Sequence, residues 1–164
     1  MFTKKLKHSS HHHGCSCPEH NLAPTTENLK KSTLTPQEQS FLLKLSQHKY
    51  LPISKFILSS TKNEEAYFTA LAPVYLEKTE DSILDVKARV VMLKNLAQQQ
   101  LISLDYGITI SNYDYNKHLD SNAYKYFIDT VSAAKNNQNF ICDTASIEYG
   151  SIALTDTGLN FIKD

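Results

Sequence analysis

The most regular hydrophobic pattern in the chain lies between residues 82 and 99. Its apolar residues recur at intervals of three, four, three and four positions: Ile83, Val86, Val90, Leu93 and Ala97. This spacing places all of these side chains on one side of an α-helix. We therefore expect a helix over residues 82–99 that buries this stripe against the rest of the fold.

A pattern with a period of two follows this helix directly. From Ile102 to Ser111, apolar and polar residues alternate without interruption. Strict alternation predicts a β-strand with one buried face and one solvated face. We expect the helix stripe and the buried face of this strand to share one hydrophobic core, with Ile152 and Leu154 beside the strand.

Capping signals predict where the first helix begins. In Thr35-Pro36-Gln37-Glu38, the threonine and the glutamate can each accept the other's backbone amide, and proline suits the first helical position. The apolar residues that follow on one face are Phe41, Leu42 and Leu45. We expect this helix to end near His48.

Shorter patterns predict two further helices before residue 82. Ile53, Phe56 and Ile57 have the i, i+3, i+4 spacing of a short helix. Acidic residues open another helical segment over residues 63–72, which Pro73 would end because proline cannot continue a helix.

The C-terminal part of the chain predicts a loop, two helices and a β region. A polar loop over residues 112–122 precedes a helix that should end near Ala134. A second β region is expected over residues 140–154, with a bulge or tight turn at Gly150-Ser151, where the apolar phase shifts. Thr155 would then cap a short final helix.

Two segments resemble the winged helix-turn-helix superfamily. Residues 89–105 are similar to its third helix and first wing strand, in which a helix ending Leu-x-x-Leu is followed by Leu-Ile and a strand. Residues 151–162 contain Leu-Thr-x-x-Gly and resemble the last wing strand and the helix after it. The resemblance implies an α+β, winged-helix-like fold over residues 34–164, helical with a small antiparallel sheet, and insertions at 59–81 and 111–146.

The same resemblance implies a DNA-binding protein, namely a transcriptional regulator that reads two half-sites as a homodimer. The third helix would enter the major groove, and its polar face carries Lys87, Arg89, Lys94 and Asn95. However, residues 32–164 contain 12 basic and 15 acidic side chains, whereas a nucleic-acid binder usually has a basic footprint. The alternative is a protein-interaction module on the same scaffold, with the two insertions as its binding surface. The zero net charge and the single arginine favour this alternative.

Residues 1–33 predict a flexible tail, because they are rich in Ser, Thr, His, Pro and Lys and follow neither hydrophobic period. Within this tail, thiolate and imidazole donors that can chelate Zn²⁺ or Cu(I) stand close together: His13, Cys15, Cys17 and His20. A metal-binding or metal-responsive protein is therefore a further alternative. One residue separates the two cysteines, whereas structural zinc sites usually place about two to four between them. The other interpretation is a polar tail that binds metal only adventitiously.

Two other groups have an ordinary structural interpretation beside a functional one. Cys142 is expected to be a small buried apolar residue, with metal ligation or nucleophilic chemistry as the alternative. Tyr113, Tyr115, His118 and Asp120 could line a pocket and perform acid–base chemistry. We expect them instead to belong to a surface loop whose Asp and Asn residues form turns.

The remaining signals predict neither an enzyme nor a membrane protein. The four glycines are scattered, and the sequence lacks the common phosphate-binding, zinc-protease and serine-hydrolase motifs. The early lysines precede histidines instead of an apolar stretch, so no export signal is predicted. No apolar run is long enough to span a bilayer, and three cysteines do not form a disulfide framework. We expect a cytoplasmic protein.

Overall fold

The structure is a computed structural model that describes residues 34–163. This part of the chain has an α+β fold, which confirms the predicted fold class. In chain order, its elements are α1 (Pro36–Gln47), β1 (Leu51–Ser59), β2 (Tyr67–Val74), α2 (Ile83–Gln98), β3 (Ile102–Tyr106), α3 (Asn116–Leu119), α4 (Asn122–Ala134), β4 (Thr144–Leu154) and α5 (Asp156–Lys163).

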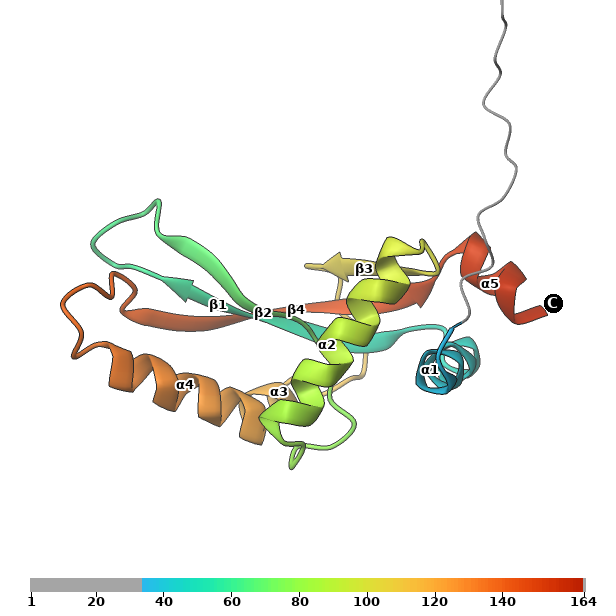
Figure 1. Cartoon of the computed structure of the whole chain (residues 1–164), viewed down its shortest axis with the longest axis horizontal. Coiled ribbons are helices and arrows are strands. Elements are labelled where there is room, and N and C mark those ends of the chain that lie inside the picture. Colours follow the sequence, from blue (N-terminus) through green and yellow to red (C-terminus); the bar gives the residue numbers. More distant parts are fainter. Residues whose placement is uncertain (1–33, 164) are drawn as a thin grey trace, which may run out of the picture. The chain divides into compact units, whose positions relative to one another are not determined.

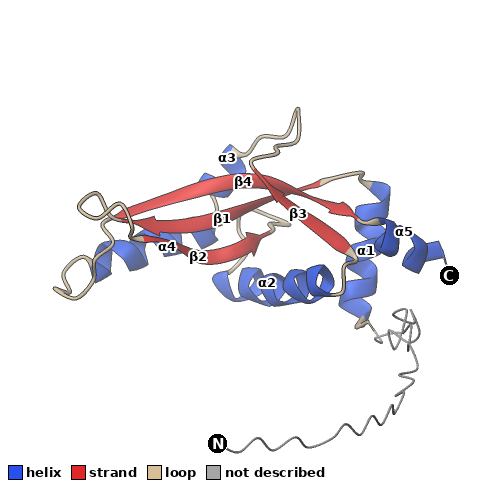
Figure 2. Cartoon of the chain, turned by 90° about the horizontal axis from the view of Figure 1, so that it is seen from above, coloured by secondary structure: helices blue, strands red, loops and turns tan. Residues whose placement is uncertain are grey.

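The strands form one antiparallel sheet in the order β2-β1-β4-β3. At its centre, β1 pairs with β4 without a break, from Leu51 opposite Ile152 to Ser59 opposite Thr144. Figure 1 shows α2 crossing in front of the sheet and α4 running below its left half. Figure 2 shows α1 and α5 together at one end of the sheet, and the two helices are in contact. Helix α2 connects two strands of this sheet, because it follows β2 and precedes β3 in the chain.

Two hydrophobic clusters pack on opposite faces of β1. Leu51 and Ile53 belong to the first cluster, together with residues of α1, α2, β3 and β4. Phe56 points to the other face, because side chains alternate along a strand, and it stacks on Phe127 of α4 with ring centroids 5.2 Å apart. Helix α2 connects the clusters, since Val86 packs in the second cluster and Leu93 in the first.

The core predicted from the sequence is confirmed for the C-terminal half of α2 and for β3, whereas Ile83 and Val86 of the predicted stripe belong to the second cluster. Leu93 of α2, Ile102 of β3 and Ile152 of β4 are all buried in the first cluster. Leu104 and Leu154 pack against this cluster, and Ile102 lies directly opposite Leu154 in the β3–β4 pairing. The C-terminal half of the helix stripe and strand β3 therefore share one interior.

Helices α1 and α2 begin with the same local structure. Thr35 accepts the Glu38 amide at 3.2 Å, and the Thr35 amide donates to the Glu38 carboxylate at 2.8 Å. Ser82 and Asp85 repeat this exchange at the start of α2, at 3.2 and 3.3 Å. Such capping boxes satisfy amides that have no partner inside the helix, and the predicted start at Thr35 is confirmed.

Within residues 34–163, no helix is both long and apolar enough to cross a bilayer.

The Thr-x-x-Gly motif docks α5 onto the junction between α2 and β3. Gln100 has φ of 58° and ends α2 in the left-handed conformation, so that the Leu101 amide reaches the Leu96 carbonyl at 3.0 Å. The Thr155 hydroxyl donates to the Gln100 carbonyl and accepts the Gly158 amide at 3.0 Å. A Cβ at Gly158 would overlap the Leu101 carbonyl. Only glycine therefore allows α5 to approach the junction this closely, and Thr155 caps α5 as predicted.

The predicted helix around Ile53, Phe56 and Ile57 is wrong, because these residues lie in β1. Both faces of β1 are covered by hydrophobic clusters, so apolar residues run almost continuously from Leu51 to Leu58. In such a run, the i, i+3, i+4 spacing does not distinguish a helix from a buried strand.

The predicted helix over residues 63–72 is also wrong, since this segment is a turn followed by β2. The Asn63 side chain accepts the Glu65 amide at 3.0 Å, and the Asn63 carbonyl accepts the Ala66 amide at 3.0 Å. The acidic residues therefore stand in a turn instead of a first helical turn. Pro73 is tolerated because β2 is an edge strand whose register with β1 is irregular there.

The segments expected as insertions are parts of the sheet and its covering helices. Residues 59–81 supply β2, and residues 111–146 supply α3 and α4. Because β1 replaces the expected second helix, residues 34–81 contain one helix and two strands. The winged-helix resemblance stays a prediction, carried by residues 82–110 and 147–163.

Two details of the predicted strands differ as well. Strand β3 ends at Tyr106 instead of Ser111, because Gly107 turns the chain with φ of 84°. At Gly150-Ser151 there is no bulge, since β4 pairs continuously with β1. The apolar phase shifts there because Ile147 faces the second cluster and Ile152 faces the first.

Candidate functional site

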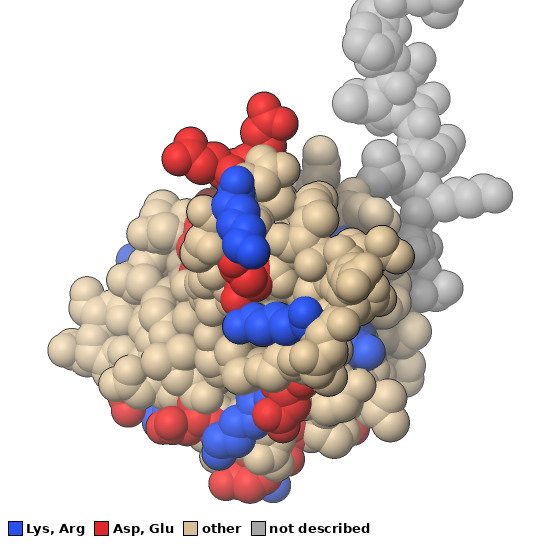
Figure 3. Space-filling view, turned by 90° about the vertical axis from the view of Figure 1, so that its left-hand side faces the viewer, with Lys and Arg blue, Asp and Glu red and all other residues tan. Residues whose placement is uncertain are grey.

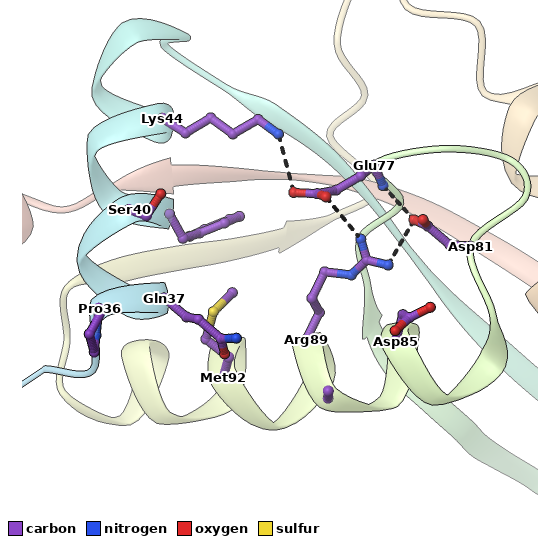
Figure 4. Close-up of a pocket in the computed structure, with 11 residues that line it drawn as sticks. Pro36, Gln37, Ser40, Lys44, Glu77, Asp81, Asp85, Arg89 and Met92 are labelled. Carbon is purple, nitrogen blue, oxygen red and sulfur yellow. Dashed lines mark hydrogen bonds and ion pairs between the residues drawn. The ribbon is translucent and has the colours of Figure 1, made fainter.

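A groove separates α1 from α2 (Figure 4). Its volume is about 530 Å³, and its walls come from α1, from the β2–α2 connection and from α2. The apolar lining residues are Pro36, Phe41, Ala88 and Met92, and the charged ones are Lys44, Glu77, Asp81, Asp85 and Arg89. A space of this volume can receive a small ligand or the side chains of a partner.

Arg89 is the centre of the charged part of the groove. Its guanidinium lies 2.7 Å from a carboxylate oxygen of Asp81 and 3.8 Å from one of Glu77. Asp81 also accepts the backbone amides of Glu77 and Lys78, at 2.8 and 3.1 Å. From α1, Lys44 reaches Glu77 at 3.5 Å, as Figure 4 shows. This Arg89 cluster joins α1, the β2–α2 connection and α2.

The four residues predicted to contact DNA do not share one surface. The Arg89 side chain is only 15% exposed and points into the groove, toward carboxylates. Lys87, Lys94 and Asn95 are exposed on the outer side of α2. The single arginine is therefore engaged within the fold, and two lysines and an asparagine remain on the open face.

A stripe of three apolar residues and one asparagine runs along this outer side of α2. We call Leu84, Ala88, Val91 and Asn95 the outer stripe; they are separated by four, three and four residues, and all are exposed. Leu84 is 72% exposed and Val91 is 60% exposed. Single exposed apolar residues are ordinary on a protein surface, whereas several on one helix face indicate a contact surface.

The two sides of the outer stripe differ in charge. Lys87 and Lys94 precede stripe residues by one position, and we call them the lysine flank. Asp85 follows Leu84 on the other side, where Glu77 and Asp81 also line the groove. Within residues 34–163, neither lysine of the flank forms an ion pair. The flank is therefore free to meet an external carboxylate or phosphate.

A second polar cluster is buried between α3, β1 and β4. His118 of α3 is fully buried, and its Nδ1 lies 2.8 Å from the Ser54 hydroxyl of β1. The Tyr115 ring stacks on the imidazole at 5.8 Å between centroids, and Tyr113 and Tyr149 approach edge-on at 6.2 Å. We call these five residues the His118 cluster. The polar loop predicted at the surface thus has its histidine in the interior.

The Ser54–His118 pair of this cluster lies away from both the α1–α2 groove and the smaller cavity beside α5. A serine and a histidine at this distance could act as a nucleophile and its base. However, Ser54 and His118 are fully buried and line neither the α1–α2 groove nor the smaller cavity beside α5. Burial lowers the pKa of His118 to about 4, and its Nε2 has no hydrogen-bond partner among the described residues. The cluster therefore fastens α3 and its loop to the sheet.

The predicted metal ligands His13, Cys15, Cys17 and His20 lie outside the described residues, so zinc binding stays a prediction. In residues 34–163, no three His, Cys, Asp or Glu side chains are placed to hold a metal ion. Cys142 is buried, which agrees with its interpretation as a small apolar residue.

Charges of both signs are mixed at the end of the domain that lies on the left in Figure 1. Figure 3 shows this end, with basic and acidic side chains next to one another on a mostly uncharged surface. A nucleic-acid site would require a patch of one sign. This face of the domain therefore does not add to the lysine flank as a basic footprint.

Comparison with known proteins gives no relative: no family model, no curated protein and no solved structure matches the chain. The candidate site consequently rests on its own residues. Sequence reasoning missed the groove and the Ser54–His118 pair. A signal was available at Ser54, which is a polar residue inside the mostly apolar run of residues 51–58. If this run had been assigned to a strand, Ser54 would have been expected next to other elements of the sheet.

Proposed function

We propose that the folded domain is a protein-binding module without enzymatic activity, and that it binds through the outer stripe of α2. The observation that supports this proposal is the exposure of Leu84 and Val91, at 72% and 60%, on one helix whose opposite face is buried. Protein interfaces combine an apolar centre with a polar rim. Here the outer stripe supplies the centre, and the lysine flank and the groove carboxylates supply the rim.

A protein partner suits this face better than DNA does. Arg89 is paired with Asp81 and Glu77. The cations that remain on the outer side of α2 are therefore Lys87 and Lys94. DNA binding requires side chains that reach phosphates or base edges. Leu84 and Val91 have no hydrogen-bond donor for a phosphate or a base edge. Covering both side chains with an apolar partner is favourable, because it removes apolar surface from water.

Photo-crosslinking in the cells that naturally contain the protein tests this role. A photoreactive amino acid replaces Val91 in the full chain, and a matched control replaces Tyr126, which is 52% exposed on α4. We expect a polypeptide adduct at position 91 and none at position 126. The proposal is wrong if position 91 gives no polypeptide adduct, or if both positions give the same adducts in equal yield.

A DNA-binding regulator is the second candidate. It is supported by the exposure of Lys87, Lys94 and Asn95 on one face of the helix that resembles a recognition helix. If it is correct, duplex DNA binding measured by fluorescence anisotropy should weaken steeply with salt. The Lys87→Ala, Lys94→Ala double variant should reduce the slope of log K against log salt by about 2. Lys135→Ala, at the end of α4, is the matched control, and an unchanged slope in the double variant would exclude this candidate.

A further inference from the structure

The segment between β3 and α4, residues 107–121, takes no part in the two hydrophobic clusters of residues 34–163. Its Ile108 and Leu119 side chains are 64% and 37% exposed. The side chains that the segment buries completely are polar, namely His118 and Ser121. Segments with little apolar burial open at a lower free-energy cost than a hydrophobic core does. Residues 107–121 can therefore leave the sheet while the rest of the domain stays folded.

The middle of this segment is held to the sheet through the His118 cluster. His118 Nδ1 lies 2.8 Å from the Ser54 hydroxyl of β1, and the Tyr115 hydroxyl donates to the Gly150 carbonyl of β4 at 2.8 Å. The Tyr115 ring lies between the imidazole and Tyr149 of β4, with centroids 5.8 and 4.9 Å away. In Figure 2, the loop between β3 and α3 projects beyond the sheet. A change in the protonation state of one imidazole therefore acts on the attachment of the whole segment.

The side chains around this imidazole do not compensate a positive charge. The titratable groups that face it are three tyrosines, Tyr113 and Tyr115 of its own loop and Tyr149 of β4. The residue that faces it from β1 is Ser54, which is neutral. An imidazolium at this place would thus be surrounded by neutral groups.

The charged residues of the neighbouring elements are engaged elsewhere or exposed. Lys55 of β1 and Glu148 of β4 point to the opposite face of the sheet, because side chains alternate along a strand, and they pair with each other at 2.8 Å. Lys117 of α3 lies over the Tyr113 ring, 5.5 Å from its centroid. The other charged residues of the segment and of α4 are exposed: Asp114, Asp120, Lys125, Asp129 and Lys135.

We propose that the His118 cluster is a proton-operated latch, in which protonation of the imidazole releases residues 107–121 from β1 and β4 while both hydrophobic clusters stay packed. An imidazolium donates from both ring nitrogens. Ser54 can accept from Nδ1, but Nε2 has no partner among residues 34–163. A buried imidazolium would therefore keep an unpaired donor and an unpaired charge, both of which reach water when the segment is released. This latch does not depend on the protein-binding role of α2.

The latch is closed at neutral pH and opens in acid. Burial lowers the pKa of His118 to about 4, whereas a released imidazole regains the ordinary pKa of about 6.5. Between these two values, the released segment binds a proton that the closed segment does not bind, so opening becomes more favourable as the pH falls. Release uncovers Tyr149 and the sheet around Ser54. Acid thereby changes one face of the sheet without unfolding the domain.

Amide hydrogen exchange of the full chain at pH 7 and pH 4.5 tests the latch. Protection factors are compared, because they already correct for the effect of pH on the exchange chemistry. The Ile110 amide, which donates to the Tyr115 hydroxyl at 3.1 Å, reports on the segment. The Leu101 amide, which donates to the Leu96 carbonyl at 3.0 Å, reports on the first cluster. On acidification, protection should fall at least about tenfold more at Ile110 than at Leu101.

An NMR titration of the His118 ring connects the release to this proton. The midpoint of imidazole protonation should coincide with the midpoint of the loss of protection at Ile110. His118→Gln, which retains an amide for Ser54, should remove the pH dependence at Ile110. His48→Gln, at the exposed end of α1, is the matched control and should leave it unchanged.

A weakened attachment should open the segment without acid. Tyr115→Phe removes the bond to the Gly150 carbonyl, so protection of the Asp120 amide in the segment should fall about tenfold already at pH 7. The Leu101 amide should keep its protection. Tyr126→Phe, at a position that is 52% exposed on α4, is the matched control and should change neither amide.

The outcomes distinguish a latch from ordinary acid unfolding. If Ile110 and Leu101 lose protection together and by the same factor, acid unfolds the domain as a whole and the proposal is wrong. It is also wrong if His118 becomes protonated while Ile110 keeps its protection, because the closed segment then accommodates the imidazolium. A segment that stays closed with neutral His118 down to pH 4.5 overturns it as well. None of these results affects the adduct expected at position 91, so the protein-binding role is tested separately.

Discussion

The Arg89 cluster and the His118 cluster both hold helices to the sheet, but they accommodate a buried polar group in opposite ways. Arg89 keeps its charge and lies between carboxylates, and the Arg89 and Asp81 side chains are 15% and 13% exposed. His118 is fully buried among a serine and three tyrosines, with no carboxylate in contact. Each side chain retains one nitrogen without a partner among the described residues, Arg89 Nε and His118 Nε2.

The difference follows from the chemistry of the two side chains. A guanidinium cannot release its proton and must be paired when it is partly buried. An imidazole can release its proton, so it avoids the free-energy cost of burying a charge by staying neutral. Around His118, burial also raises the pKa of Tyr113 and Tyr115 in its own loop and of Tyr149 in β4. No group there supplies a countercharge, so the stability contributed by the His118 cluster should depend on pH. The stability contributed by the Arg89 cluster should instead depend on the presence of both charged partners.

Acidification should give the largest effect and thereby separate the clusters most clearly. The pKa of His118 is about 4 in the folded chain, below the ordinary value of about 6.5. Between these two values, the unfolded chain binds a proton that the folded chain does not bind. The stability contributed by neutral His118 is therefore complete above about pH 6.5 and decreases as the pH falls toward 4, by up to about 3 kcal/mol. Urea unfolding near pH 7 and near pH 4.5 measures this loss.

A variant that cannot titrate isolates the contribution of His118. His118→Gln retains an amide that can bond to Ser54, so the difference in unfolding free energy between the two pH values should shrink by most of this amount. His48→Gln, at the exposed end of α1, is the matched control and should leave the difference unchanged. If His118→Gln keeps the full pH dependence, the assignment of acid sensitivity to this cluster is wrong.

Removal of the guanidinium should give the next largest effect. Arg89→Met keeps an unbranched side chain of similar length and leaves the Asp81 carboxylate with two backbone amides as partners. We expect a loss of about 2 kcal/mol in the free energy of unfolding, because a mostly buried carboxylate loses its countercharge. Urea unfolding near pH 7 measures the loss. Lys87→Met, on the exposed face of the same helix, should change stability by less than about 0.5 kcal/mol, and an equal loss in both variants would contradict the role assigned to Arg89.

Removal of the serine hydroxyl tests the neutral cluster without a change of pH. Ser54→Ala leaves both ring nitrogens of His118 without a partner, which should lower the free energy of unfolding by about 1.5 kcal/mol. Thermal unfolding measures this loss, with Ser132→Ala on the exposed side of α4 as control. Amide hydrogen exchange should also accelerate at Ile110, whose amide donates to the Tyr115 hydroxyl at 3.1 Å. Unchanged exchange at Ile110 would show that the Ser54–His118 bond does not hold this loop.

The sequence predicted the elements whose signals are local. Helix α1 follows from a capping box that spans four residues, and α2 follows from the spacing of its apolar stripe. Strand β3 follows from its alternation, although its end depends on Gly107. The pairing of β3 with β4 was also predicted, because Ile152 and Leu154 were expected beside the alternating strand, and Ile102 lies opposite Leu154.

The parts that were not predictable depend on contacts between distant segments. Strand β1 resembles a helix because both of its faces are buried, which is a property of the whole sheet. Ser54 and His118 are 64 residues apart in the chain. Arg89 was expected on an open face, since no periodic pattern reveals that Asp81 folds back from the β2–α2 connection to meet it. The sequence analysis did not identify the outer stripe, because the exposure of Leu84 and Val91 depends on which face of α2 packs in the core.

Neutralisation of Glu77 should give the smallest effect and define the extent of the Arg89 cluster. The Glu77 side chain is 53% exposed and lies 3.5 Å from Lys44 and 3.8 Å from Arg89. Exposed pairs of this kind contribute little and are screened by salt, so Glu77→Gln should lower the free energy of unfolding by about 0.5 kcal/mol at low salt and by less at high salt. Asp81→Asn is the matched comparison and should cost about as much as Arg89→Met. A double-mutant cycle between Glu77→Gln and Arg89→Met measures the coupling. If that coupling accounts for most of the Arg89→Met loss, the exposed Glu77 stabilises the domain as strongly as the buried Arg89–Asp81 pair does, and the small contribution expected of Glu77 is wrong.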